Sequence, residues 1–149
     1  MRSHDIAENL AKAEKLPLGH YGRKEAEDLV AEEYRLCRAF EGKFSWKSRY
    51  IKVCDIGRII GKICFALGIN PPKRVILESD EVHSHAGAHY SSWSKEIHFP
   101  SKWVGTTTLL HELSHHVKYV GKFYGRGDHG PEFVEAEELV FQVAKDIGL

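Results

Sequence analysis

Apolar residues recur every three or four positions in several stretches of the chain, a spacing that places them on one face of an α-helix. The clearest stretch spans residues 105–120, where Leu110, Leu113 and Val117 share one face. Threonines precede this apolar face and a glycine follows it, so both ends carry residues that suit a helix boundary. We therefore predict an amphipathic helix over residues 105–120.

Four further segments show helical spacing. They are residues 5–15, residues 23–40, a segment from Asp55 to residue 67, and a segment that begins at Pro131. Asp55 can cap its helix at the start, and the glycine at position 68 can end it. Pro131 suits the first turn of a helix, and acidic residues follow it where they favour that turn.

Strands are predicted in the second half of the chain. Residues 74–78 form a short apolar run, while residues 89–91 and 96–99 flank a polar turn and indicate a hairpin. The sequence Asn-Pro-Pro at positions 70–72 separates these strands from the helices before them. Helices and strands occur in separate runs, which predicts an α+β fold.

Length and composition are those of one globular domain. The chain has 149 residues, of which 42% are hydrophobic and 28% charged, enough to build a core. We expect a single domain over residues 1–149, with a helical part at residues 1–70 and a core that carries the site at residues 73–149.

The predicted helix at residues 105–120 contains the motif H-E-x-x-H, formed by His111, Glu112 and His115. Residues four apart lie about one turn apart on the same face, so the two imidazoles can meet at one point. A catalytic zinc ion takes three protein ligands and leaves one position for water. Glu112 lies beside the first ligand, where it can accept a proton from that water.

A third ligand is available downstream. His129 lies in a segment rich in Gly and Pro, just before the helix that begins at Pro131. Glu135, on that helix, is the alternative third ligand, because a carboxylate serves equally well in zinc chemistry. Tyr119, Tyr124, Arg126 and His116 are candidates to stabilise an oxyanion.

The two motifs resemble those of the SprT-like zinc metallopeptidases, which include the Spartan DNA–protein crosslink proteases. The resemblance rests on H-E-x-x-H followed by H-G-P-E-F at the start of the next helix, and covers about residues 88–141. It implies a zincin-like core at residues 73–149 and a site with zinc ligands His111, His115 and His129 and the general base Glu112. The family's Cys-rich zinc ribbon and DNA-targeting tail have no counterpart in the sequence, so the resemblance implies the peptidase core alone.

The cysteines and the termini indicate a cytoplasmic protein that does not enter a membrane. Cys37, Cys54 and Cys64 show no C-x-x-C spacing, and we expect reduced thiols, with Cys54 and Cys64 in the core. The sequence has no apolar run of about 18 residues, as a membrane helix requires, and no apolar segment of a signal peptide at its N-terminus.

Charge is distributed unevenly although the formal net charge is zero. The segment from Lys43 to Arg74 carries a net charge of +7, and residues 128–146 carry −5. Within residues 43–50, basic residues alternate with aromatic ones, as in proteins that bind single-stranded nucleic acid. The alternative is a solvated loop whose aromatic side chains anchor it to the core.

Other histidines allow further hypotheses. His83, His85 and His89 would share a face of one strand and could form a second metal site, or they are ordinary loop histidines. His98 could face the cleft, but nothing gives it a role. His116 lies about 100° around the helix from His115 and cannot join the same site. By analogy with zincin-like cores, residues 88–99 could pair with substrate backbone through a sheet edge.

Three functions fit these patterns. The leading one is a zinc-dependent metallopeptidase in which Glu112 acts as general base on a protein or peptide substrate. The second is a non-catalytic, zinc-stabilised module that binds nucleic acid through residues 43–74 or binds another protein. The third is a peptidase that acts on one partner protein, which docks on the N-terminal helices.

Overall fold

The computed structural model describes residues 23–44, 46, 49–77, 87–121 and 129–149, and for residues 23–27 and 29 it describes the backbone alone. The described residues contain helices and small sheets, which confirms the predicted α+β class. The helices are α2 (Arg23–Glu41), α3 (Val53–Leu67), α4 (Thr106–Val120) and α5 (Pro131–Asp146). The predicted helix at residues 5–15 lies outside the described residues.

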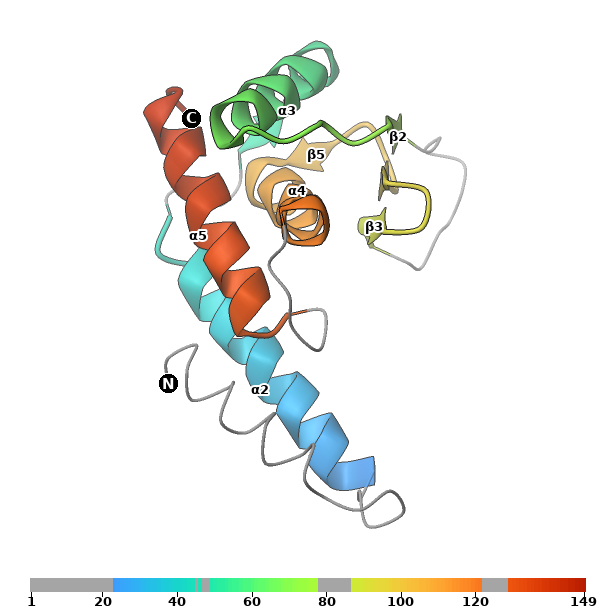
Figure 1. The fold of residues 1–149 in the computed structure, drawn as a ribbon, viewed down its shortest axis with the longest axis vertical. Coiled ribbons are helices and arrows are strands. Elements are labelled where there is room, and N and C mark those ends of the chain that lie inside the picture. Colours follow the sequence, from blue (N-terminus) through green and yellow to red (C-terminus); the bar gives the residue numbers. More distant parts are fainter. Residues whose placement is uncertain (1–22, 45, 47–48, 78–86, 122–128) are drawn as a thin grey trace.

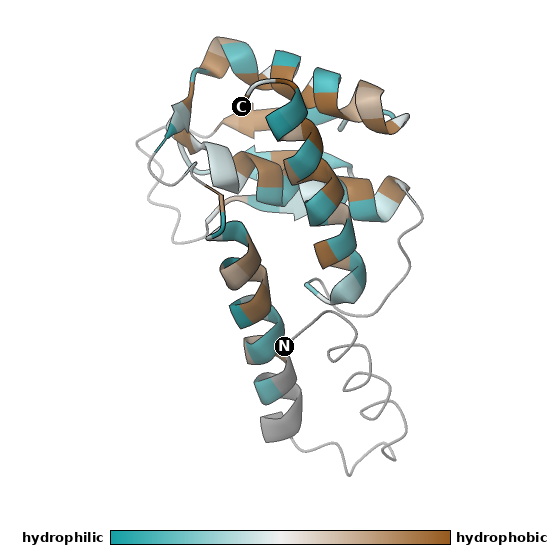
Figure 2. Ribbon diagram, turned by 90° about the vertical axis from the view of Figure 1, so that its left-hand side faces the viewer, coloured by the Kyte–Doolittle hydropathy of each residue, from teal (hydrophilic) through white to brown (hydrophobic). Residues whose placement is uncertain are grey.

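Helix α4 occupies the centre of the fold (Figure 1). It packs against α5 along much of its length and against strand β3 (His89–Ser91) on another side. Leu109, Leu110 and Leu113 are fully buried on it. A helix with this much apolar surface is stable only between other elements, which explains its central place. Figure 2 shows hydrophobic and hydrophilic residues alternating around the helices, as the sequence pattern predicts.

The predicted hairpin is present within a three-stranded sheet of order β2-β4-β3. Strand β3 runs antiparallel to β4 (Glu96–Phe99), and β2 (Arg74–Leu77) runs parallel to β4 on its other side. A second ribbon pairs β1 (Tyr50–Ile51) with β5 (Val104–Gly105). Strands of two residues are too short to show alternation, so the sequence did not predict this ribbon.

Helix α3 shares its hydrophobic core with the segments that follow the Asn-Pro-Pro boundary. Its buried residues Ile59, Ile60 and Ile63 belong to the same cluster as Leu113 on α4 and Val140 on α5. This cluster joins the expected helical part and the expected core.

Aromatic side chains attach the segment between α2 and β1 to the core. Phe44 stacks on Trp46 with ring centroids 4.9 Å apart, and both rings meet Phe141 of α5 edge-on, at 4.8 and 5.2 Å. Trp46 is only 1% exposed. These two aromatics of the basic segment therefore serve the core, as the anchoring alternative predicts.

Two expectations for α3 were wrong. Lys52, not Asp55, holds the N-cap position, and Asp55 lies in the first turn, where its carboxylate pairs with Arg58 at 3.2 Å. Cys54 is exposed rather than buried, because helical spacing places it on the face of Gly57 and Arg58. Cys64 is buried, as expected.

Helix α4 begins and ends where the sequence predicts. It starts at Thr106 after Gly105, and its C-cap Gly121 donates its backbone N–H to the carbonyl of Val117 at 2.7 Å. The threonines do not cap it through their side chains; Thr106 Oγ1 instead donates to the carbonyl of Arg49. Among the described helices, none is both long and apolar enough to cross a bilayer.

Candidate metal centre

Three histidines from two elements converge beside α4. His111 and His115 come from consecutive turns of α4, and His129 comes from the residues immediately before α5. The Nε2 atoms of His111 and His129 are 3.1 Å apart, and one ligand nitrogen from each of the three rings lies within 4.8 Å of the others. Three nitrogens gathered in this way could hold one metal ion. A zinc ion bound to them would lie about 2.0–2.1 Å from each nitrogen.

Glu135, the alternative third ligand, does not join this group. It is exposed on α5, whereas His129 is buried beside the two histidines of α4. The geometry therefore favours the three-histidine set over the carboxylate alternative.

Phe133 forms an apolar floor under the histidines. Its ring centroid lies 5.0 Å from that of His111, 4.4 Å from that of His115 and 5.0 Å from that of His129. Phe133 is fully buried in the first turn of α5, so packing holds its ring in place. One rigid side chain thus limits how far each imidazole can tilt.

Behind His111 lies a second group of polar side chains. The Nδ1 atom of His111 is 3.1 Å from Glu41 Oε2 on α2 and 3.4 Å from Glu137 Oε2 on α5. The thiol of Cys37 lies 3.6 Å from a carboxylate oxygen of each of these glutamates. With Nδ1–H donating to a carboxylate, Nε2 faces the other two histidines and is the nitrogen available to a metal.

The pKa values of the two histidines of α4 are shifted in opposite directions. Burial lowers the pKa of His111, but hydrogen bonds with Cys37, Glu137 and Glu41 outweigh it and raise that pKa to about 12. Burial and the charges of His111 and His129 lower the pKa of His115 to about 2. Two ring nitrogens 3.1 Å apart need a proton or a metal ion between them, because two facing lone pairs repel.

Glu112 follows His111 on α4. It is buried, at 6% exposure, yet lines the same cleft as the three histidines. Burial raises its pKa to about 7, against the opposing charge of His111. A carboxylate whose pKa lies near neutrality can accept a proton and release it again in one reaction cycle.

The cleft beside these residues has a volume of about 890 Å³. One wall is formed by α4, including Lys118 and Tyr119, and another by α2, including Arg38. The third wall is β3, preceded by Gly87 and Ala88. Within the described residues β3 pairs with β4 on one side only, so its other edge is the place where an added strand could bind.

Helix α2 supplies walls of the site that the sequence did not reveal. Its Tyr34 ring packs against His129 with centroids 4.3 Å apart, and its Cys37 and Glu41 lie behind His111. One signal was available: Glu33, Cys37 and Glu41 are spaced four apart, which puts two acids on a buried face of a helix. Glu137 gives the same signal on α5, since it falls among buried apolar positions.

The remaining candidates have other surroundings. His116 faces away from the metal centre, as predicted; its ring nitrogens lie 2.8 Å from Tyr90 Oη and from the carbonyl of Asn70. Burial lowers the pKa of His116, and both of its ring nitrogens already have partners, so neither is available to an oxyanion in the cleft. His89 stacks on His98 with centroids 4.7 Å apart. His83, His85, Tyr124 and Arg126 lie outside the described residues.

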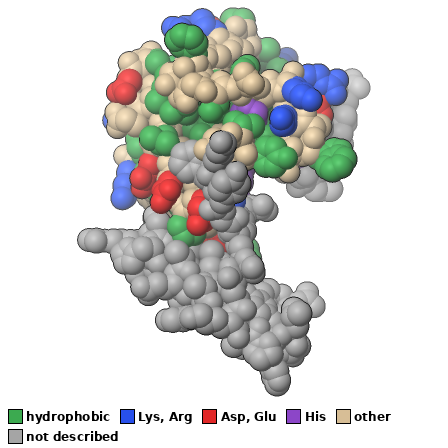
Figure 3. Space-filling view, in the orientation of Figure 1, with side chains coloured by type: hydrophobic (Ala, Val, Ile, Leu, Met, Phe, Trp, Pro, Cys, Tyr) green, Lys and Arg blue, Asp and Glu red, His purple; other side chains and the backbone are tan. Residues whose placement is uncertain are grey.

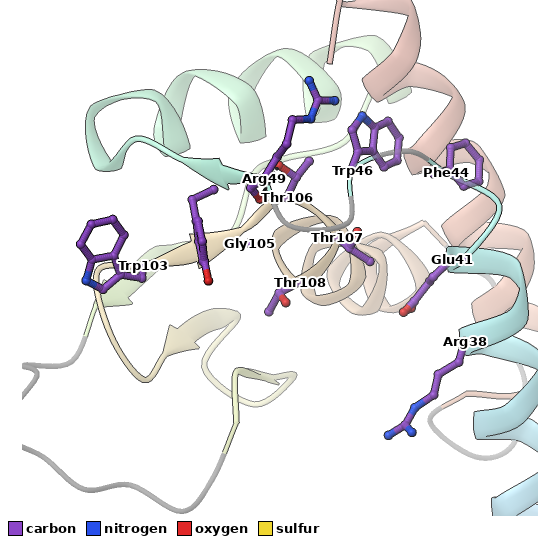
Figure 4. Close-up of a pocket in the computed structure, with 12 residues that line it drawn as sticks. Arg38, Glu41, Phe44, Trp46, Arg49, Trp103, Gly105, Thr106, Thr107 and Thr108 are labelled. Atoms are coloured by element: carbon purple, nitrogen blue, oxygen red, sulfur yellow. Dashed lines mark hydrogen bonds between the residues drawn. The ribbon is translucent and has the colours of Figure 1, made fainter.

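A second cavity of about 590 Å³ adjoins the N-terminal end of α4 (Figure 4). Figure 4 shows α4 end-on, with Arg38 and Glu41 on one side and Trp103 on the other. Tyr50 and Trp103 line this cavity and are 64% and 66% exposed, with ring centroids 5.9 Å apart. Arg38 lines both cavities, so the two adjoin at this side chain.

The uneven charge of the sequence is visible on the surface. Figure 3 shows acidic side chains on the left-hand side, over α5, with a basic side chain beside them, and further basic side chains at the top, over α3, and at the right, near β2. Histidine side chains are visible between these groups.

Searches of protein-family models, of curated proteins and of solved structures find no match to this chain.

Proposed function

We propose that this protein is a zinc-dependent metallopeptidase with a zincin-like core. The observation that supports the proposal is the meeting of three imidazoles and one buried carboxylate in a single cleft. Chance placement of H-E-x-x-H on a surface helix would not bring a third histidine from another element within 4.8 Å. Nor would a purely structural zinc site require Glu112 beside the ligands.

The residues fit a zinc ion in number and type. Imidazole nitrogen suits zinc, and three such ligands leave a fourth position open to the cleft. The ion would be held by His111, His115 and His129, and when bound it would supply a Lewis acid that activates water and polarises the scissile carbonyl. The lowered pKa of His115 keeps its ring neutral, in the form that binds metal.

Glu112 would perform the proton transfers. Its carboxylate would accept a proton from the attacking water and then deliver it to the leaving amine. Its buried position excludes bulk water from the carboxylate, which strengthens its interaction with the reacting groups. Tyr119 and Lys118 line the same cleft and are the candidates for stabilising the developing oxyanion.

Strand β3 would align the substrate. An extended peptide that adds to the edge of β3 that pairs with no other described strand would gain backbone hydrogen bonds and lie along the cleft beside α4. This narrows the predicted substrate strand from residues 88–99 to β3, because β4 is paired on both sides.

Substitution of Glu112 by Gln tests the mechanism. The variant should keep its zinc, but its rate of peptide hydrolysis should fall by about 100-fold or more, since general acid–base catalysis contributes about 10²–10⁴-fold to the rate. Hydrolysis of denatured casein by zinc-loaded wild type, E112Q and E138Q is the measurement. Glu138 is exposed on α5, so E138Q should match the wild type. Full activity in E112Q would contradict the proposed mechanism.

A second candidate function is a non-catalytic module that binds single-stranded nucleic acid. The observation in its favour is the exposed pair Tyr50 and Trp103, which line the second cavity as Arg49 does. Aromatic stacking with nearby cations suits unpaired bases. Binding of labelled single-stranded DNA should then weaken steeply with salt and fall in R49Q and Y50A. Such binding, combined with no hydrolysis by the zinc-loaded protein, would favour this function over the peptidase.

A further inference from the structure

The group behind His111 has the geometry of a support for a metal ligand. It consists of Cys37 and Glu41 from α2 and Glu137 from α5, and one ligand atom from each lies within 4.8 Å of the others and of a ring nitrogen of His111. Glu137 is 0% exposed. Burying a carboxylate costs several kcal/mol unless it is paired, and here its oxygens face the Cys37 thiol and His111 Nδ1.

Two interpretations of this group compete. A second metal ion could occupy it, since it offers sulfur, oxygen and nitrogen ligands. That would require His111 to lose its Nδ1 proton while Nε2 also binds a metal, and Cys37 to lose its thiol proton. Hydrogen bonding requires neither loss, because Nδ1–H and S–H are donors and the carboxylates are acceptors.

We propose that Glu41 and Glu137 are positioning residues that fix His111 in the Nδ1-protonated tautomer and aim its Nε2 at the metal. The inference rests on the three-histidine site of the proposed function, but not on hydrolysis. Glu41 is the nearer acceptor at 3.1 Å, and Glu137 is the more deeply buried one at 3.4 Å. Carboxylates in this role raise the basicity of the ligand and typically change metal affinity by about 10–100-fold.

The two acceptors come from different helices, which makes the role specific to this fold. Glu41 lies in the last turn of α2, and Glu137 lies in the second turn of α5. The metal centre therefore depends on α2 and α5 closing on α4 from behind His111, and not only on the residues of the H-E-x-x-H motif.

The experiment measures zinc affinity by competition with a chromophoric chelator in the full chain. E137M and E41M, which remove the acceptor but keep the side-chain length, should each weaken zinc binding by about 10–100-fold. E137Q, which keeps an oxygen acceptor, should recover part of that loss. E138M, one residue away on the exposed face of α5, should bind as the wild type does. Thermal unfolding of the metal-free proteins identifies any variant that has not folded.

A spectroscopic signature separates positioning from a general structural effect. In the zinc-loaded wild type, the ¹⁵N chemical shifts of His111 should show a protonated Nδ1, and in E41M/E137M they should show a mixture of tautomers. If the double variant fails to fold, E41M alone provides the test, since Glu41 is partly exposed. Wild-type zinc affinity in folded E41M and E137M would overturn the inference.

Stoichiometry distinguishes the competing outcomes. One equivalent of zinc, retained in C37S, supports the positioning role. A second equivalent that disappears in C37S would overturn it in favour of the second metal site. If zinc affinity depends on Glu41 and Glu137 but E112Q remains active, the inference stands and the proposed mechanism fails.

Discussion

Several polar side chains are buried around α4, and each has a neighbour that accounts for its position. Ser114 donates to the carbonyl of Leu110 at 2.6 Å, and His116 bridges Tyr90 and Asn70. A buried polar group is tolerated only when its hydrogen bonds are made, so His116 specifies how α4 sits against β3 and the segment before β2.

Substitution of His116 by Phe tests this interpretation at the residue scale. Phe fills the space but leaves Tyr90 Oη without its buried partner, so the free energy of unfolding should fall by about 2–3 kcal/mol. Urea unfolding is the measurement. Y90F removes one of the two hydrogen bonds of His116 and should lower the free energy of unfolding by about 1 kcal/mol. An unchanged midpoint in H116F would show that His116 contributes only its volume.

Some residues of the candidate site could be predicted from local sequence and others could not. His111, His115 and Glu112 could be predicted because their spacing depends only on the pitch of one helix. His129 could be predicted because the segment before Pro131 is rich in Gly and Pro. Glu41 could not be predicted, because it lies 70 positions from His111 in the sequence and contacts it only through the packing of α2.

At the scale of the element, the three-stranded sheet combines a parallel and an antiparallel pairing around β4. Arg74 on β2 lies opposite Glu96 on β4, and their side chains form an ion pair across the strands. Hydrogen bonding with Ser94, in the turn between β3 and β4, also acts on Glu96. The hairpin was predictable from local residues, whereas the parallel partner β2 was not, since nothing local sets its neighbour.

The lowered pKa of Glu96 predicts that this residue contributes to the free energy of unfolding in a way that depends on pH. Hydrogen bonding with Ser94 and the charge of Arg74 lower the pKa of Glu96 from 4.5. Its contribution is therefore present above pH 4.5 and is lost as the pH falls through the folded-state pKa. Urea unfolding from neutral pH to well below that value should show a smaller loss of stability in E96Q than in the wild type. Equal losses would contradict the prediction.

At the scale of the whole molecule, the candidate metal centre lies where α2, α4 and α5 meet. Tyr34 and Glu41 from α2 contact the histidines, Phe133 from α5 lies under them, and β3 closes the cleft opposite. The α+β class and most helix boundaries followed from periodicity. The closure of α2 on the site did not, because it depends on burial of polar residues that local patterns assign to solvent.

A ligand that joins several elements should stabilise the whole fold. Zinc at about 100 times its dissociation constant should add about 2.7 kcal/mol to the free energy of unfolding and raise the melting temperature. H129A should lose this gain, whereas E135A should keep it, because Glu135 is exposed. Thermal unfolding with and without zinc is the measurement, with metal content determined in parallel. Loss of the gain only in E135A would instead identify the carboxylate as the third ligand.

The exposed position of Cys54 makes this chain convenient for labelling. Burial raises the pKa values of the Cys37 and Cys64 thiols to about 12 and about 11, so neither forms the reactive thiolate near neutral pH. A maleimide dye should therefore attach at Cys54, on the outer face of α3, without any substitution. The native protein would then carry one fluorophore at a known position, well suited to following α3 while the metal centre is filled and emptied.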